Sequence, residues 1–169
     1  AATTVIIVGD NGTDARVAND LSRARAKGSI YQGGIHVPMV VWGSAVSTAG
    51  RSEALINLVD IFPTVLDLMG IPHTEVIDGV SFAEVLQGGP GDRAVLFSEL
   101  FGTDQPADQA GTTVSDGRWQ YLLFDDGTEE LFDLVSDPTE STNLLETPGV
   151  AGAAALAQLR THLESITSG

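Results

Sequence analysis

The sequence predicts an α/β fold in two parts: the end of an α/β sheet layer, followed by a small antiparallel sheet that packs on a C-terminal helix. First, residues 4–8 form a continuous apolar, β-branched run, which is typical of a strand buried on both faces of a parallel sheet. Second, strand-like segments alternate with turn residues after the glycine-rich stretch 87–92. Third, an apolar stripe within residues 153–166 predicts an amphipathic helix. We therefore expect two domains, residues 1–88 and 89–169.

Turn residues dominate the segments around the first two predicted strands. Residues 9–12, Gly-Asp-Asn-Gly, end the first strand as a turn. Residues 14–26 are polar and predict a loop or a short exposed helix. Residues 28–34 contain three glycines, so we expect a loop whose backbone can approach a ligand closely. The second strand is predicted over residues 35–42, with Pro38 near its start or at an edge because proline cannot donate to the ladder.

A helix is predicted over residues 61–69. Asp60 is its expected N-cap, Pro63 is tolerated in the first turn, and Gly70 ends it. Because apolar side chains occur almost all round this helix, we expect it to be well buried.

The second domain is expected to contain three or four short antiparallel strands and the C-terminal helix. One strand is predicted over residues 94–100. Residues 112–115 and 118–124 form a predicted hairpin, with Asp116-Gly117 as its two-residue turn. A further strand is predicted over residues 130–134. Three aromatic side chains of the hairpin are expected to pack the sheet against the terminal helix: Trp119, Tyr121 and Phe124.

The composition excludes several classes of partner and chemistry. The chain has 169 residues, of which 43% are hydrophobic, and a formal net charge of −15, which repels nucleic acid and anionic membranes. It contains no cysteine, so it forms no disulfide and holds no thiolate ligand or nucleophile. No apolar stretch reaches the roughly 18 residues of a membrane span. The chain opens on a predicted strand without a basic signal-peptide region, so we expect that an upstream segment was removed or never included.

The candidate site combines one cation with two oxygen ligands. Lys27 is the only lysine of the chain, and it precedes the glycine-rich loop. Asp10 and Asn11 follow the first strand, and ligands of α/β sheets bind beyond the carboxyl ends of strands. Together these groups can hold a divalent cation and an oxyanion. Spacing alone leaves open a simple turn at Asp10 and a solvated Lys27, and Ser29 lacks a histidine placed to activate it as a nucleophile.

Five segments follow one another in the order known from one enzyme family. They are Asp10-Asn11-Gly12, residues 27–38 (KGSIYQGGIHVP), 59–71 (VDIFPTVLDLMGI), 78–81 (DGVS) and 130–144 (ELFDLVSDPTESTNL). Through these segments the chain resembles the C-terminal part of a sulfatase, in the alkaline-phosphatase-like superfamily. The resemblance implies that the first part belongs to an alkaline-phosphatase-like α/β core.

The resemblance also implies roles for individual residues. Asp10 and Asn11 correspond to ligands of a divalent cation, usually calcium, and Lys27 corresponds to the catalytic lysine that contacts the substrate sulfate. His36 stands where the family usually has arginine before Val-Pro. It is a second candidate for substrate binding, although its apolar strand favours a core histidine.

The family's nucleophile is a formylglycine made from Cys or Ser in a Cys/Ser-x-Pro-x-Arg motif, which this chain lacks. The remaining metal carboxylates of the family lie in the same upstream part. Two ligands are few for calcium, which takes roughly 6–8 oxygens, so we expect the 169-residue chain alone to be inactive.

Two other functions remain open. The first is a phosphonate or phosphate ester hydrolase of the same superfamily. Its paired transition metals would need more His and Asp ligands, so the Asp-Asn pair favours a sulfatase. The second is a non-catalytic partner or structural module. In every case the exposed sheet edge needs cover, by an N-terminal half of the enzyme or by self-association.

The substrate is expected to be a small sulfate ester or a sulfated glycan, with residues 103–111 as a candidate rim loop. His73 and His162 are expected at the surface. The family resemblance suggests a periplasmic or secreted protein.

Overall fold

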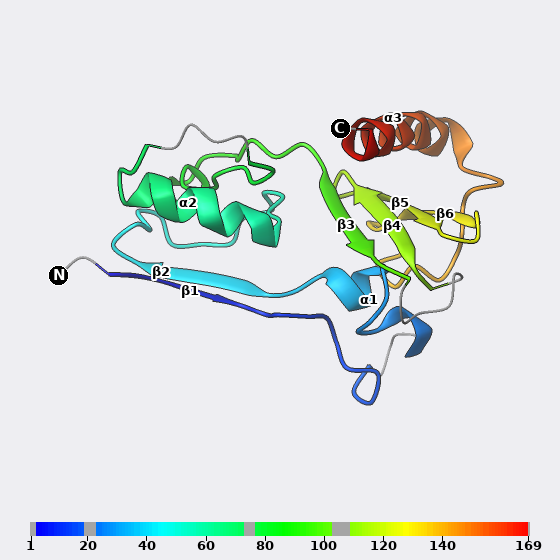
Figure 1. Ribbon diagram of the computed structural model, residues 1–169, viewed down its shortest axis with the longest axis horizontal. Helices are drawn as coiled ribbons and strands as arrows, with labels where there is room; N and C mark the ends of the chain where they lie inside the picture. The colour runs from blue at the N-terminus through cyan, green and yellow to red at the C-terminus, as the bar shows by residue number, and fades with distance from the viewer. Residues whose placement is uncertain (1–2, 19–22, 73–76, 103–108, 169) are drawn as a thin grey trace. The chain divides into compact units, whose positions relative to one another are not determined.

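The computed structural model in Figure 1 describes residues 3–18, 23–72, 77–102 and 109–168. His73 and most of the predicted rim loop lie outside these residues. The described part contains no helix long and apolar enough to cross a membrane. The chain divides into two compact units: Ala1–Val8 with Pro38–Leu96, and Gly9–Val37 with Phe97–Gly169. The second unit therefore takes in a segment from the N-terminal part of the sequence, whereas the prediction placed a single boundary near residue 88.

The first unit contains a two-stranded antiparallel sheet. Strand β1 covers Thr4–Val8 and strand β2 covers Met39–Gly43, with Ile7 opposite Val40. The expectation of a parallel-sheet strand buried on both faces is wrong for this structure: Ile7 is 57% exposed and its partner Val40 is equally so. Strand β2 begins directly after Pro38, which agrees with the predicted place of this proline near a strand start.

Helix α2 covers Ile61–Leu68, one residue shorter than predicted. Its expected burial is wrong, because only the side that carries Pro63 and Thr64 is fully packed, while Phe62 is 60% and Met69 66% exposed. Thr64 fixes the packed side: its hydroxyl donates to the Asp60 carbonyl at 2.6 Å and accepts the Phe82 N–H at 2.9 Å.

Asp60 lies before α2 but does not cap it. Its buried carboxylate accepts the backbone N–H groups of Asn57 and Val80, each at 2.7 Å, and forms an ion pair with Arg93. The bond to Asn57 belongs to the capping box of the 3₁₀ turn η2, Leu58–Asp60. The predicted N-cap role for α2 is therefore wrong. Asp60 instead ties the start of this helix to the segment that contains the 3₁₀ turn η3, Val85–Gln87.

The second unit is built on a four-stranded sheet, within the three or four strands that the sequence predicts, and the strand order is β3-β4-β5-β6. The strands are β3 Leu96–Leu100, β4 Gly111–Ser115, β5 Trp119–Phe124 and β6 Glu129–Asp133. Helix α3, Gly149–Thr167, packs on β4 and β5 (Figure 1). The fully buried residues of α3 are Gly152, Ala155, Leu159 and Leu163.

The hairpin between β4 and β5 turns one residue later than predicted. Ser115 pairs with Gln120, and the Asp116 N–H donates to the Trp119 carbonyl at 3.2 Å, so the two-residue loop is Gly117-Arg118. Gly117 adopts a φ of 90°, which suits the first central position of a primed turn. The carboxylate of Asp116 accepts the Trp119 N–H at 2.6 Å and stabilises the turn from outside the loop.

The two faces of β5 pack against different parts of the second unit. Trp119 lies against α3, where a Cβ on Gly152 would come within 3.1 Å of the indole. Tyr121 lies on the same face, beneath the guanidinium of Arg160 of α3. Phe124 points to the other face, where it clusters with Ile30, so its predicted contact with the terminal helix is wrong. The alternation of side chains along a strand explains the difference.

The glycine-rich segment covers that second face of the sheet. The 3₁₀ turn η1, Arg23–Arg25, precedes this segment, where the sequence predicted a loop or a short exposed helix. The segment ends in the one-turn helix α1, Gln32–Ile35, where the sequence predicted a loop running into a strand. Ile30 is 1% exposed and packs with Leu122, Phe124 and Phe132 of the sheet. The sheet of the second unit is thus covered on both faces.

Candidate active site

Asp10 and Asn11 lie directly after β1 and are exposed. The Asn11 side-chain N–H donates to the Gly12 carbonyl at 2.9 Å, which leaves its side-chain oxygen available as a ligand. Within the described residues, no side chain hydrogen-bonds to the Asp10 carboxylate. Both residues therefore present oxygens to the surface at the end of the strand.

Three backbone hydrogen bonds join this turn to the lysine segment. The Gly12 N–H donates to the Gly34 carbonyl at 3.0 Å, and the Thr13 N–H donates to the Gly33 carbonyl at 2.8 Å. The Lys27 N–H donates to the Thr13 carbonyl at 2.8 Å. Thr13 lies two residues after Asn11, and two residues span at most about 7 Å of chain. The backbone of Lys27, which bonds to Thr13, therefore lies close to the Asp-Asn pair.

Glycine is required at two of these contacts. A Cβ on Gly12 would lie 2.1 Å from the Gly33 carbonyl oxygen, and a Cβ on Gly34 would lie 2.2 Å from the Ser29 carbonyl oxygen. No side chain can approach backbone so closely, so Gly12 permits the contact between the two segments, and Gly34 permits the tight turn of its own segment against Ser29. The concentration of glycines in residues 28–34 is the sequence signal for this contact.

The side chain of Lys27 is exposed, and its charge acts on Asp14. The pKa of Asp14 is lowered mainly by its ion pair with Arg16, whose Nε lies 2.9 Å from Oδ1, and to a lesser degree by Lys27. Sequence reasoning missed Arg16 as a second cation here. The Asp-x-Arg spacing was its only signal. Both cations are exposed, as expected for groups that meet an anion from solution, and the guanidinium of Arg16 is held by the Asp14 carboxylate.

His36 is exposed and follows α1, where its N–H donates to the Gln32 carbonyl at 2.8 Å. The expectation of a core histidine is wrong, because the α1 turn replaces the start of the predicted strand and carries this residue to the surface. His162 of α3 is exposed as predicted.

Side chains of the C-terminal part hold the segment just after Lys27. The Tyr31 hydroxyl donates to Glu130 at 2.7 Å, and the Gln32 N–H donates to Glu140 at 2.7 Å. The Gln120 amide donates to the Ile30 carbonyl at 3.2 Å. Sequence reasoning missed all three partners, although two of them, Glu130 and Glu140, lie in the motif of residues 130–144.

The donor set suits a hard cation but is incomplete. Carboxylate and carboxamide oxygens are ligands that calcium prefers, and calcium takes roughly 6–8 of them. In the part of the chain that the structure describes, no group of three or more His, Asp or Glu residues could hold a metal. Asp10 and Asn11 would thus contribute only part of a coordination sphere.

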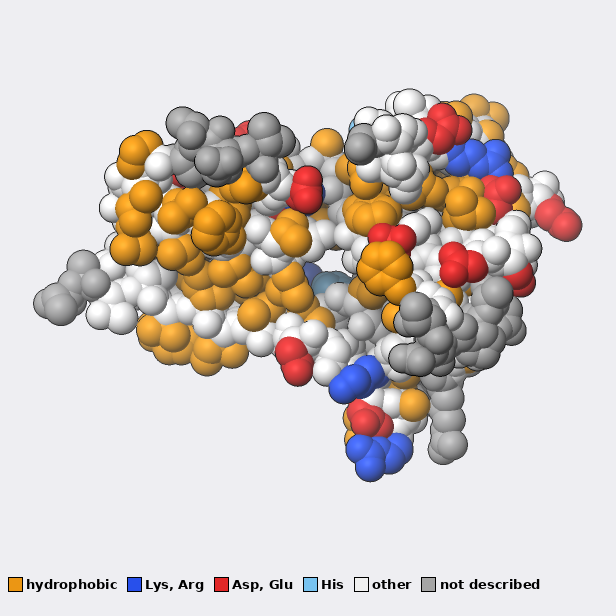
Figure 2. All heavy atoms as spheres, in the orientation of Figure 1, with side chains coloured by type: hydrophobic (Ala, Val, Ile, Leu, Met, Phe, Trp, Pro, Cys, Tyr) orange, Lys and Arg blue, Asp and Glu red, His pale blue; other side chains and the backbone are white. Residues whose placement is uncertain are grey.

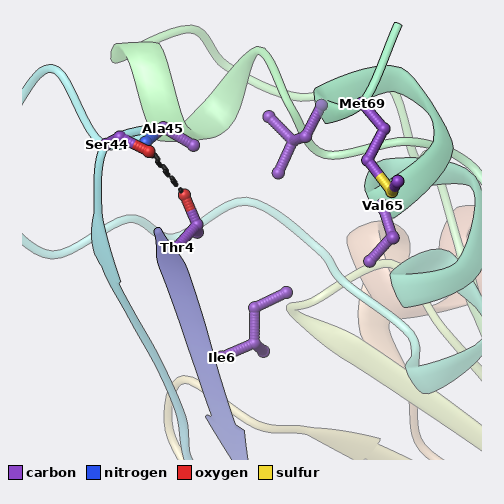
Figure 3. A pocket seen from close by; sticks show the side chains of 7 residues that line it. Thr4, Ile6, Ser44, Ala45, Val65 and Met69 are labelled. Atoms are coloured by element: carbon purple, nitrogen blue, oxygen red, sulfur yellow. Dashed lines mark hydrogen bonds between the residues drawn. The ribbon is translucent and has the colours of Figure 1, made fainter. Parts of the chain in front are cut away.

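A separate cavity of about 530 Å³ lies within the first unit between β1, the end of β2 and α2 (Figure 3). Its lining is mostly apolar and contains no titratable side chain; the residues are Thr4, Ile6, Ser44, Ala45, Val65, Leu68 and Met69. The hydroxyls of Thr4 and Ser44 satisfy each other at 3.3 Å. The cavity therefore lacks groups for acid–base or nucleophilic chemistry.

Comparison with known proteins agrees with this architecture. Residues 1–71 match the family model described as Sulfatase. Arylsulfatase K of Gallus gallus is 35% identical over 130 residues, which cover 70% of this chain and 24% of that protein. The chain belongs to the sulfatase family, and it spans about a quarter of the length of the curated relatives it matches.

Solved structures share the fold over almost the whole chain. A 2-O GAG sulfatase superimposes with a TM-score of 0.80 and 25% identity, covering 98% of this chain and 36% of that one. A phosphonate monoester hydrolase of Agrobacterium radiobacter superimposes with a TM-score of 0.63 and 24% identity, covering 82% of this chain and 30% of that one. The mixed α/β fold with a C-terminal helix is that of sulfatases and is shared with this hydrolase.

Proposed function

We propose that this chain forms part of a sulfuric ester hydrolase. Asp10 and Asn11 would bind calcium, and Lys27 would contact the sulfate as the catalytic cation of this region. His36 would approach the substrate from the surface beside α1. The observation that carries the proposal is the set of backbone hydrogen bonds that joins residues 12–13 to Lys27 and to the Gly33-Gly34 carbonyls.

The proposed chemistry is neutralisation of charge. Calcium bound by the Asp-Asn pair would polarise a sulfate oxygen. The ammonium group of Lys27 would stabilise the negative charge that develops on the sulfate as the ester bond breaks. The nucleophile, a formylglycine, would come from a region that this chain does not contain. We expect the chain alone to lack turnover.

The proposed substrate class rests on a structural relative that is described as a 2-O GAG sulfatase. A sulfated glycan is therefore our first choice, and a small sulfate ester is the second. The phosphonate or phosphate ester alternative shares the fold. The Asp-Asn pair argues against it, because paired transition metals need more His and Asp ligands. We propose a periplasmic or secreted compartment on the family resemblance.

The first unit also needs a partner. Ile7, Val40 and Trp42 are exposed on one face of the β1–β2 sheet, and Phe62 and Met69 are exposed on α2. Hydrophobic side chains gather over this unit in Figure 2. We propose that the N-terminal half of the enzyme covers these residues, and that self-association covers them in its absence.

Anion binding by the ¹⁵N-labelled chain tests the proposal. Sodium sulfate should shift the backbone amide signals of Gly12, Lys27 and Gly28 more than sodium chloride of equal ionic strength, and Lys27→Ala should abolish the difference. Arg16→Ala is the matched control, because it removes a neighbouring exposed cation that the proposal does not use. Equal loss in both variants, or no loss in Lys27→Ala, would contradict a specific role for Lys27.

Calcium binding by the same labelled chain provides a second test. Calcium chloride should shift the amides of Asp10 to Gly12, and Asp10→Asn should reduce that response. Hydrolysis of an aryl sulfate by the purified chain would contradict the expectation that it is inactive alone.

A further inference from the structure

Glu140 is a fully buried carboxylate in an unusual backbone conformation. Its exposed fraction is 0%, and its φ of 56° makes it the one non-glycine residue with positive φ in the described part of the chain. The left-handed region is unfavourable for a non-glycine residue, and such residues persist where the surroundings require them. The backbone conformation and the burial together indicate that the surroundings, and not local backbone preference, fix Glu140 in place.

The contacts of Glu140 reach the candidate site. One carboxylate oxygen accepts the Gln32 N–H at 2.7 Å, while the other, Oε1, is buried and has no hydrogen-bond partner among the residues that the structure describes. Gln32 lies 108 positions away in the sequence and immediately precedes the Gly33-Gly34 pair. The carbonyls of that pair accept the N–H groups of Thr13 and Gly12.

Charged groups from three directions face this carboxylate. Arg25 of η1 favours its ionised form, whereas Glu130 of β6 and Asp137 of its own loop disfavour it. Burial has the largest effect and raises the pKa of Glu140 to about 7. The guanidinium of Arg25 is shared, because it also lies 4.9 Å from the centre of the Tyr31 ring.

We propose that Glu140 is a positioning residue for the candidate site. It holds the Gln32 amide and so fixes the Gly33-Gly34 carbonyls against which the Asp10-Asn11 turn and the Lys27 backbone are aligned. The consequence for sulfate contact depends on the proposed function, but the positioning itself does not. The C-terminal sheet, through the loop after β6, thereby sets the geometry of a site formed by the N-terminal part of the chain.

The test measures amide hydrogen exchange in the full 169-residue chain with three variants. In Glu140→Ala, exchange of the Gln32, Gly12 and Thr13 amides should accelerate at least tenfold relative to the amide of Leu122 in β5. Glu140→Gln keeps the acceptor and should retain most of the protection. Glu146→Gln, an exposed glutamate on the same segment, should have no effect. Unchanged Gln32, Gly12 and Thr13 exchange in a folded Glu140→Ala variant would overturn the proposal.

A second readout applies even where Glu140→Ala does not fold. Between pH 5 and 8.5 the Gln32 amide signal of the native chain should move with an apparent midpoint near neutrality, and this titration should vanish in Glu140→Gln. Its persistence in Glu140→Gln would overturn the proposal. Sulfate titration of the same samples separates the two claims: if the segment loosens while sulfate binding is retained, Glu140 positions the loop without any effect on sulfate contact, and the role of Lys27 is decided by Lys27→Ala.

Discussion

The two units of the chain bury their apolar residues to very different degrees. Among the described residues, most fully buried hydrophobic side chains belong to the second unit, whereas the first unit contributes only Pro63, Phe82 and Leu86. Most of the exposed large hydrophobic side chains belong to the first unit. The second unit has layers on both faces of its sheet, but the first has α2 on one face only. The second unit thus has a packed core, whereas the first leaves much of its apolar surface exposed.

The two units are also held together by different kinds of interaction. In the first unit, α2 is joined to the segment after it by the buried ion pair between Asp60 and Arg93. The Val80 N–H also donates to Asp60, and the Phe82 N–H donates to Thr64. The second unit depends on a packed core and on several side-chain hydrogen bonds to the glycine-rich segment. Mutations should therefore act through electrostatics in the first unit and through packing in the second.

Removal of the buried ion pair should have the largest effect. Arg93→Ala leaves the Asp60 carboxylate buried without its cation, so we expect a loss of about 3–5 kcal/mol in the free energy of unfolding of the first unit. Urea unfolding followed by tryptophan fluorescence would measure it. Arg51→Ala removes an exposed pair with Glu53 and should cost at most about 1 kcal/mol. Similar small losses in both variants would contradict the account.

A methyl group at Gly12 should disrupt the contact between the site segments. Gly12→Ala would force its Cβ against the Gly33 carbonyl, and we expect a cost of about 1–3 kcal/mol with large shifts of the Thr13 and Lys27 amide signals. Gly50→Ala is the matched control, because a Cβ there meets no atom within 4 Å. If Gly12→Ala were as stable as Gly50→Ala, the close approach of the two segments would be wrong.

The stability of the second unit should depend on pH through Glu140. Burial raises the pKa of its carboxyl from 4.5 to about 7, so the native state binds more protons than the unfolded state between these values. The free energy of unfolding should therefore fall as pH rises from about 4.5 to 7. Glu140→Gln should remove this component and make the chain more stable than the native sequence at pH 8. Thermal unfolding at pH 5 and pH 8 measures this dependence. If the native chain and Glu140→Gln lost the same stability between these two pH values, the assignment to Glu140 would be wrong.

Polar substitution of the exposed apolar face should have the smallest effect on folding. Trp42→Ser and Phe62→Ser should lower the free energy of unfolding by about 1 kcal/mol or less, since about half or more of each side chain is exposed. Both should reduce self-association in sedimentation measurements. Val150→Ser, at a 93% exposed position on α3, is the control and should leave association unchanged. Strong destabilisation by Trp42→Ser or Phe62→Ser would show that this apolar face of the first unit is packed and not exposed.

Local patterns predicted the second unit well. The turn residues around Asp116 and the apolar stripe of the terminal helix are short-range signals, so the hairpin and α3 follow from the sequence to within a few residues. The one-residue error in the hairpin arose because an Asp-Gly pair can lie inside a turn or at its entrance. Here Asp116 binds backbone N–H groups from the entrance.

Long-range partners could not be predicted. The apolar run of β1 carries no information on its neighbour, so its antiparallel pairing with β2 was missed. Asp60 looked like a helix cap because Arg93 is 33 positions away. Glu140 gave no local sign that it would hold the Gln32 amide. The family motifs pointed to the convergence of Asp10, Asn11 and Lys27, while the roles of these three residues stay predictions.

The most direct test of the account is whether the Asp-Asn turn and the lysine segment share hydrogen bonds in solution. Through-hydrogen-bond scalar couplings in isotope-labelled protein should join the Lys27 nitrogen to the Thr13 carbonyl carbon, and the Thr13 nitrogen to that of Gly33. Couplings across β4 and β5 provide the reference in the same spectrum. The presence of both cross-peaks is the predicted result. Their absence beside intact β4–β5 couplings would contradict the shared site.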